Sequence, residues 1–254
     1  MLGRISSSTS PIKPSKSSDV VREGLICCYE FSTPGSYSSS AGSTVTDLIG
    51  NSNASLQNSP AYTSPVGQTA GYLQFNGTNQ YLVTQTNLNS KLSPANTSTI
   101  ISVFVWVYMS DNGVIVSELG QTTPNTGWHD SQIEMVSNTL KFRVWNSANP
   151  TLTVNTDYRN GWHLIGYTIS PKTSGENRTL TAYVDGVNVG SNTQTAWTQS
   201  YSGSVSHSIG SLDRTSLGDG TAGDFRFNSF YLYGKALTST EVLNLYTLTK
   251  GCKR

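Results

Sequence analysis

Short runs of alternating apolar and polar residues, each ending at turn residues, constrain this chain more than any other sequence feature. In the clearest example, residues 180–184 alternate up to Asp185-Gly186, and residues 187–189 resume the alternation. Asp-Gly can adopt positive φ at both central positions of a type I′ turn, which joins adjacent antiparallel strands. The segment therefore predicts a tight β-hairpin.

The same pattern recurs along most of the chain. Ser137-Asn138 separates two alternating segments and predicts a second hairpin. Residues 100–109 are nearly continuously β-branched or aromatic, which predicts a central strand buried on both faces. Further strands are expected at residues 25–31, 72–75, 81–83, 162–169, 207–209 and 225–233. The sequence therefore predicts an all-β protein.

One helix is expected, close to the C-terminus. Thr238-Ser239-Thr240-Glu241 has the form of a capping box, in which the first and fourth residues satisfy each other's backbone N–H groups. Val242, Leu245 and Tyr246 then fall on one helical face, and Gly251 follows as a stop signal.

Four segments, taken in order, resemble the laminin-G-like, concanavalin A-like jelly-roll family. They are Gln74-Phe75-Asn76-Gly77 with Tyr81-Leu82-Val83, Trp162-His163, Tyr183-Val184-Asp185-Gly186, and residues 224–242. The resemblance covers roughly residues 24–250 and implies a jelly-roll sandwich of two antiparallel sheets with one short C-terminal helix. In many relatives, loops at one rim bind glycans or protein partners, sometimes through calcium.

Calcium is disfavoured here. The positions at which the family usually carries Asp are occupied by Asn76 and Asn228. Calcium prefers several oxygen ligands, carboxylates among them, and two lost carboxylates weaken such a site. We therefore expect no strongly bound calcium, no other metal and no cofactor.

The composition excludes some partners. Charged residues make up 12% of the 254 residues and the formal net charge is +1, so nucleic acid is not expected as a partner. The chain has neither an N-terminal apolar stretch of the secretory kind nor an apolar run long enough to span a membrane. A soluble protein with neutral, amide- and hydroxyl-rich outer faces is expected.

Residues 1–22 differ from the rest of the chain. They are rich in Ser, Pro, Lys and Arg and poor in large apolar residues, which is typical of a flexible arm. We expect residues 23–254 to form the folded domain and the arm to contact other subunits of an assembly. The cations that would serve this purpose are Arg4, Lys13, Lys16 and Arg22.

The cysteines predict free thiols. Cys27 and Cys28 are adjacent, so on a strand they face opposite sides and at most one is expected in the core. Cys252 lies at the far end of the chain.

Catalytic patterns are not found in the sequence. A glycosidase needs two carboxylates about 5–10 Å apart across one sugar ring. Glu118 and Glu134 are isolated acids, interpreted as surface or strand-end residues, and His129, His163 and His207 lack metal-ligand spacing. We expect a protein that is not an enzyme.

Aromatic residues in polar loops are the candidate binding residues. Trp128 lies in a Gly/Thr/Pro-rich loop, and Trp197 and Tyr201 lie in the polar stretch 191–204. They would either stack on sugar rings or cap the ends of the sandwich core, and the sequence leaves both open. Trp106, Trp145 and Trp162 follow strand patterns and are expected in the core.

Two functions remain open. The first is a structural component of a virion capsid or fibre, because jelly rolls leave few free sheet edges and expose many loops for lateral contacts. The alternative is a carbohydrate-binding, lectin-like module for adhesion or receptor binding, at a cell surface or outside the cell.

Overall fold

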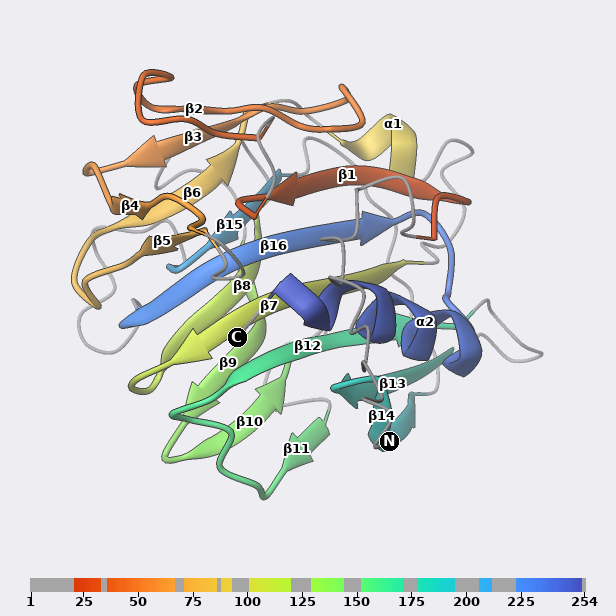
Figure 1. Ribbon diagram of the computed structural model, residues 1–254. Coiled ribbons are helices and arrows are strands. Elements are labelled where there is room, and N and C mark those ends of the chain that lie inside the picture. Colours follow the sequence, from red (N-terminus) through yellow and green to blue (C-terminus); the bar gives the residue numbers. More distant parts are fainter. Residues whose placement is uncertain are drawn as a thin grey trace, which may run out of the picture.

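The described residues form two antiparallel sheets of eight strands each (Figure 1). The computed structural model describes residues 21–32, 36–66, 71–85, 88–92, 101–119, 129–143, 152–170, 178–194, 206–211 and 223–252. Within these residues no helix is long and apolar enough to cross a membrane. The all-β sandwich expected from the sequence is confirmed.

The first sheet, here called the front sheet, has the strand order β14-β13-β12-β7-β16-β5-β4, and β1 also pairs with β16. Its strands are β1 (Leu25–Glu30), β4 (Ala61–Thr63), β5 (Tyr72–Gln74), β7 (Ser102–Met109), β12 (Trp162–Ile169), β13 (Arg178–Val184), β14 (Val187–Gln194) and β16 (Phe225–Tyr233).

The second sheet, the back sheet, has the order β11-β10-β9-β8-β15-β6-β3-β2. Its strands are β2 (Thr44–Val45), β3 (Ala54–Gln57), β6 (Tyr81–Thr84), β8 (Gly113–Leu119), β9 (His129–Val136), β10 (Thr139–Phe142), β11 (Leu152–Val154) and β15 (Ser206–Ile209). Consecutive strands β8 to β11 are neighbours, whereas β15 and β6 meet from distant parts of the sequence.

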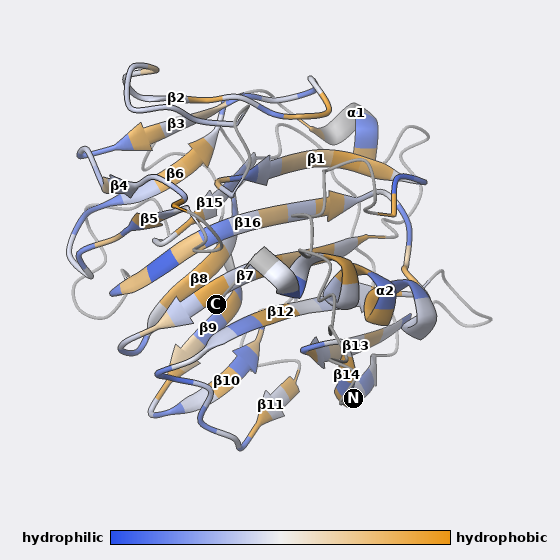
Figure 2. Cartoon of the chain, in the orientation of Figure 1, coloured by the Kyte–Doolittle hydropathy of each residue, from blue (hydrophilic) through white to orange (hydrophobic). Residues whose placement is uncertain are grey.

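The main hydrophobic core contains alternate residues of both sheets. Val103, Val105 and Val107 of β7 belong to it, as do Ile133 and Met135 of β9. Figure 2 shows β7 as mostly hydrophobic, whereas in β16 hydrophobic residues alternate with hydrophilic bands. One face of each sheet is thus removed from water, as the period of two in the sequence requires.

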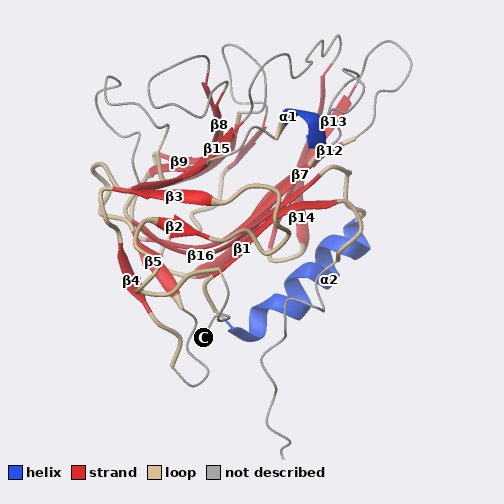
Figure 3. Cartoon of the chain, turned by 90° about the horizontal axis from the view of Figure 1, so that it is seen from above, coloured by secondary structure: helices blue, strands red, loops and turns tan. Residues whose placement is uncertain are grey.

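Helix α2 (Ser239–Thr249) lies on the other, outer face of the front sheet (Figures 1 and 3). Thr238 is its N-cap, and the capping box with Glu241 is present, so the expected helix is confirmed. Two short helices, α1 (Asn89–Leu92) and the 3₁₀ helix η2 (Lys250–Cys252), were not expected.

A second apolar cluster forms beneath α2. Leu237, Val242 and Leu245 pack against outer-face residues that include Trp106 and Tyr231. Residues 102–107 of β7 are therefore buried on both faces, by the core on one side and by α2 on the other, as expected for this part of residues 100–109.

The expectation that at most one of the two adjacent cysteines lies in the core is wrong, because α2 also covers the outer face of the front sheet. Cys27 and Cys28 do face opposite sides of β1 and are free thiols, but both are buried. Cys27 belongs to the main core and Cys28 to the cluster beneath α2. Burial raises the pKa of both thiols well above the usual range.

Both expected hairpins are confirmed. Asp185 and Gly186 have φ values of 52° and 81° and join β13 to β14. Ser137 and Asn138 have φ values of 52° and 61° and join β9 to β10. Positive φ at both central positions is the signature of the type I′ turn.

Candidate functional site

The residues chosen from the sequence as binding candidates lie outside the described part of the chain. This holds for Trp128, Trp197 and Tyr201, and for Arg4, Lys13 and Lys16 of the arm. Arg22 is described and exposed, and its carbonyl accepts a hydrogen bond of 3.1 Å from the Leu25 N–H just before the first strand.

The structure draws attention to a different surface, the part of the front sheet's outer face that α2 leaves uncovered. In Figure 1 this part lies to the left of α2, where β7 ends and where β12 and β16 begin. Strand register places Trp162 opposite Tyr108, Tyr108 opposite Arg226, and Arg226 opposite Gln74. Opposed residues of neighbouring strands point to the same face, so these four side chains form one row across four strands.

Three half-buried rings line this row. Trp162 meets Tyr108 edge to face, with centroids 6.0 Å apart and an interplanar angle of 67°. It meets Tyr72, two residues before Gln74 on β5, at 6.1 Å and 61°. We call Tyr72, Tyr108 and Trp162, together with Arg226, the aromatic platform; all four side chains keep part of their surface in solvent.

Arg226 lies over both tyrosine rings of the platform. Its guanidinium carbon is 4.8 Å from the Tyr108 centroid and 5.3 Å from the Tyr72 centroid. Its Nε donates to Gln74 Oε1 at 3.3 Å, and Gln74 Nε2 donates to Asp224 Oδ1 at 2.8 Å. Gln74 thus separates the guanidinium from the Asp224 carboxylate and fixes the position of both.

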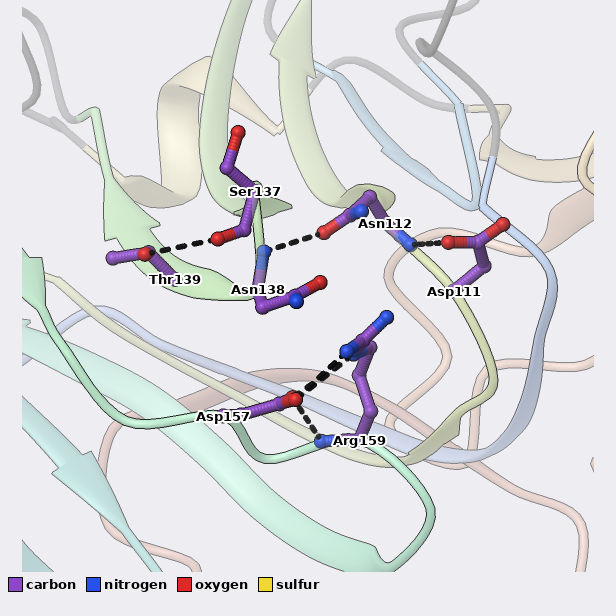
Figure 4. A network of polar contacts seen from close by, with 7 residues as sticks. All are labelled: Asp111, Asn112, Ser137, Asn138, Thr139, Asp157 and Arg159. Carbon is purple, nitrogen blue, oxygen red and sulfur yellow. Dashed lines mark hydrogen bonds and ion pairs between the residues drawn. The ribbon is translucent and has the colours of Figure 1, made fainter.

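The turn that follows β7 and the loop that precedes β12 are held by their own polar groups (Figure 4). Asn112, in the turn that follows β7, accepts the Asn138 backbone N–H at 3.0 Å, and Asp111 accepts the Asn112 N–H at 2.7 Å. This ties the end of β7 to the β9–β10 hairpin.

The loop before β12 is fixed in a similar way. Asp157 accepts hydrogen bonds from Nε and Nη2 of Arg159, which lower the pKa of its carboxyl to about 2 (Figure 4). The Asn160 N–H donates to the Met109 carbonyl at 2.8 Å, which joins this loop to the end of β7. The end of β7 and the start of β12, which carry Tyr108 and Trp162, are therefore fixed in position.

The expectation that Trp162 is a core residue is only partly correct: Trp162 is half-buried and packs against the cluster beneath α2 on the outer face. Trp106, by contrast, is buried beneath α2, and Trp145 lies outside the described residues. Arg226 is the sequence signal that could have indicated this surface. A cation between Phe225 and Phe227 in an alternating strand points away from the core.

Glu118 and Glu134 are both buried, so neither is a surface acid, and Glu134 lies inside β9. Glu134 pairs with Arg143, and His163 bonds the Asp185 carboxylate at 2.7 Å near the start of β12. Glu118 is fully buried beside the end of β8 and accepts a hydrogen bond from Gln132, so its interpretation as a surface acid is wrong. His207 is also fully buried, and desolvation lowers its pKa to about 3.

The two asparagines at the family's Asp positions are used by the fold. Asn76 Oδ1 accepts backbone N–H groups of the turn that follows it, at 3.0 Å from Thr78. Asn228 is buried and donates to Ser32 Oγ at 2.7 Å and to the Gly71 carbonyl. Among the described residues, no three of His, Cys, Asp and Glu gather as metal ligands would.

Comparison with protein families agrees with this architecture. The model Laminin_G_3, described as the concanavalin A-like lectin/glucanases superfamily, matches residues 68–243, more than half of the chain. The chain belongs to this superfamily. The resemblance inferred from the four motifs is therefore confirmed, whereas comparison with curated proteins gives no match.

Solved structures share the fold of this concanavalin A-like domain at low sequence identity. A Trypanosoma rangeli sialidase in complex with 2,3-difluorosialic acid is 14% identical with a TM-score of 0.62, over 91% of this chain and 33% of the sialidase. The binding domain of Paraclostridial Mosquitocidal Protein 1 is 16% identical with a TM-score of 0.59, over 88% of this chain and 52% of that one. The chain thus spans about a third and about half of these structures, and the likeness establishes the fold alone.

Proposed function

We propose that this chain is a non-catalytic carbohydrate-binding module and that the aromatic platform holds the sugar. The observation that carries the proposal is the row of half-exposed rings with Arg226 at its centre. Sugar rings present apolar C–H faces that stack on aromatic side chains, while a few fixed polar groups orient the hydroxyls. Arg226 supplies donors, and Asp224 Oδ2, which has no partner among the described residues, supplies an acceptor.

The comparisons support carbohydrate recognition, and the carboxylates of the site favour binding over hydrolysis. The superfamily is one of lectins and glucanases, and the structural neighbours include a sialidase bound to a sialic acid derivative and a domain described as a binding domain. Asp224 is the one described carboxylate bonded to this row, through Gln74, whereas a glycosidase of the usual kind needs two carboxylates across one sugar ring. Such a module acts where glycans are displayed, so we propose a location on a particle or cell surface or outside the cell.

The proposal is tested on a glycan array with the full chain and two variants. Trp162→Ala removes the central ring of the platform, and Leu243→Ala removes an apolar side chain that is 49% exposed on α2. We expect binding by the wild type, at least about tenfold weaker binding by Trp162→Ala, and no change in Leu243→Ala. Thermal melts establish that both variants are folded, and a Trp162→Ala variant that binds like the wild type refutes the platform as the site.

An assembly role for the arm stays a prediction, since residues 1–20 lie outside the described part of the chain. It is compatible with glycan binding, because a particle component can also recognise a sugar. Deletion of residues 1–22 is expected to weaken association with the other subunits and to leave glycan binding unchanged.

A further inference from the structure

We infer that the aromatic platform selects sugars that carry a carboxylate, with Arg226 as the residue that recognises it. This inference rests on the proposed function and narrows it to acidic sugars, of which uronic and sialic acids are the two sources. Three properties of Arg226 lead to it: its unpaired charge, the atoms it leaves free, and the rings that hold it.

The charge of Arg226 is not neutralised within the described structure. Arg143, Arg159 and Lys235 each pair with a carboxylate, whereas Arg226 makes no ion pair with any described residue. Its one hydrogen bond goes to the neutral amide of Gln74. A half-buried cation that pairs only with a neutral group can attract an anionic ligand strongly, because partial desolvation weakens the screening of its charge.

The atoms that Arg226 leaves free suit a carboxylate. Nε is engaged with Gln74, so the edge formed by the two terminal Nη groups remains. Two N–H groups on this edge match the two oxygens of a carboxylate in a bidentate pair. A single guanidinium balances one negative charge, whereas phosphate groups are usually recognised by clusters of arginines.

The rings of the platform keep this edge in place. Cation–π attraction to Tyr72 and Tyr108 restricts the guanidinium, so less side-chain freedom is lost when a ligand binds. A second cation lies further along the same face: Lys250 Nζ is 5.2 Å from the Tyr246 centroid, and Tyr246 stacks on Trp106, two residues before Tyr108. Lys250 thus adds a second cation beside the rings of this face.

The test compares matched glycans by isothermal titration calorimetry. One pair is an oligosaccharide that ends in glucuronic acid and its carboxyl-reduced form; the other is a sialylated oligosaccharide and its carboxyl-reduced form. A sulfated oligosaccharide serves as a third anion. The full chain should bind at least one of the two acids about tenfold or more tightly than its reduced form.

Arg226→Gln should bring the acid and its reduced form to within about twofold of each other, and Arg226→Lys should keep part of the preference. Lys91→Gln, which removes an exposed charge on α1, is the matched control and should keep the full preference. Should Arg226→Gln fail to fold, a salt titration of the wild type decides, because added NaCl should weaken binding of the acid and not of its reduced form.

Different results would overturn the carboxylate inference and the proposed function. Equal wild-type affinity for the acid and its reduced form, or preference for the sulfated glycan, overturns the carboxylate inference and leaves carbohydrate binding standing. Failure of the wild type to bind any glycan, on the array and in solution, overturns the proposed function itself.

Discussion

The outer face of the front sheet has two halves that use the same strands differently. In the covered half, defined by the outer-face residues that contact α2, Trp106 and Tyr231 are buried with apolar neighbours. In the uncovered half, Tyr108 shares β7 with Trp106 and Arg226 shares β16 with Tyr231, but Tyr108 and Arg226 both lie half in solvent. Whether a ring in this strand pattern is buried or half-exposed therefore depends on whether α2 covers it.

The strongest way to test this contrast is to truncate two rings on one strand. Trp106→Ala loses its packing beneath α2 and its 2.7 Å hydrogen bond to Thr249, and should lower the free energy of unfolding by about 3–5 kcal/mol. Tyr108→Ala, two residues further along β7, should lower it by only about 1 kcal/mol. Urea unfolding measures both, and equal losses would show that the two halves do not differ in burial.

Acid pH tests whether the two halves unfold as one unit. His207 contacts Phe230 of β16, the strand that carries both Arg226 and Tyr231. Its folded-state pKa of about 3 lies below the ordinary 6.5, so below pH 6.5 the unfolded chain binds a proton that the folded chain does not. At pH 4 this should remove on the order of 3 kcal/mol of stability.

His207→Gln isolates this effect from the other acids of the chain. The loss of stability between pH 7 and pH 4 should be smaller in the variant, and far- and near-ultraviolet circular dichroism should report one shared transition. An identical loss in both proteins would show that His207 is protonated in the folded state.

The Asp185–Gly186 turn lies close to Leu243 and Tyr246 of α2, the helix that covers this half. A Cβ added to Gly186 would lie 3.1 Å from Leu243 of α2, at a φ of +81° that side chains rarely adopt. Gly186→Val should therefore lower the free energy of unfolding by roughly 2 kcal/mol. Val187→Thr, at a neighbouring exposed position, is the control and should be nearly neutral; equal melts of both variants would contradict the turn assignment.

The smallest effect is expected at the N-terminus of α2. Thr238→Ala removes the side chain that caps the Glu241 N–H at 3.2 Å and should cost about 1 kcal/mol. Hydrogen exchange should then quicken in α2 while the uncovered half keeps its rates. Unchanged exchange in α2 would show that packing beneath the helix, and not its cap, limits its opening.

Local signals explain what could be predicted from the sequence. Asp185-Gly186 sets a turn and Thr238 to Glu241 start a helix through contacts within a few residues, so both were predicted correctly. The aromatic platform depends instead on register between β5, β7, β12 and β16, and on where α2 ends. Trp106 and Trp162 follow the same strand pattern, and nothing near them in sequence distinguishes the buried ring from the half-exposed one.

The central claim is that the uncovered half binds sugar and the covered half does not, and the two indole groups report on it directly. In a nitrogen-15 NMR titration with a glycan identified on the array, assigned through Trp→Phe variants, the Trp162 indole N–H signal should shift and saturate. The Trp106 signal, held by Thr249 beneath α2, should stay in place. Saturating glycan that leaves the Trp162 signal unmoved would contradict the account.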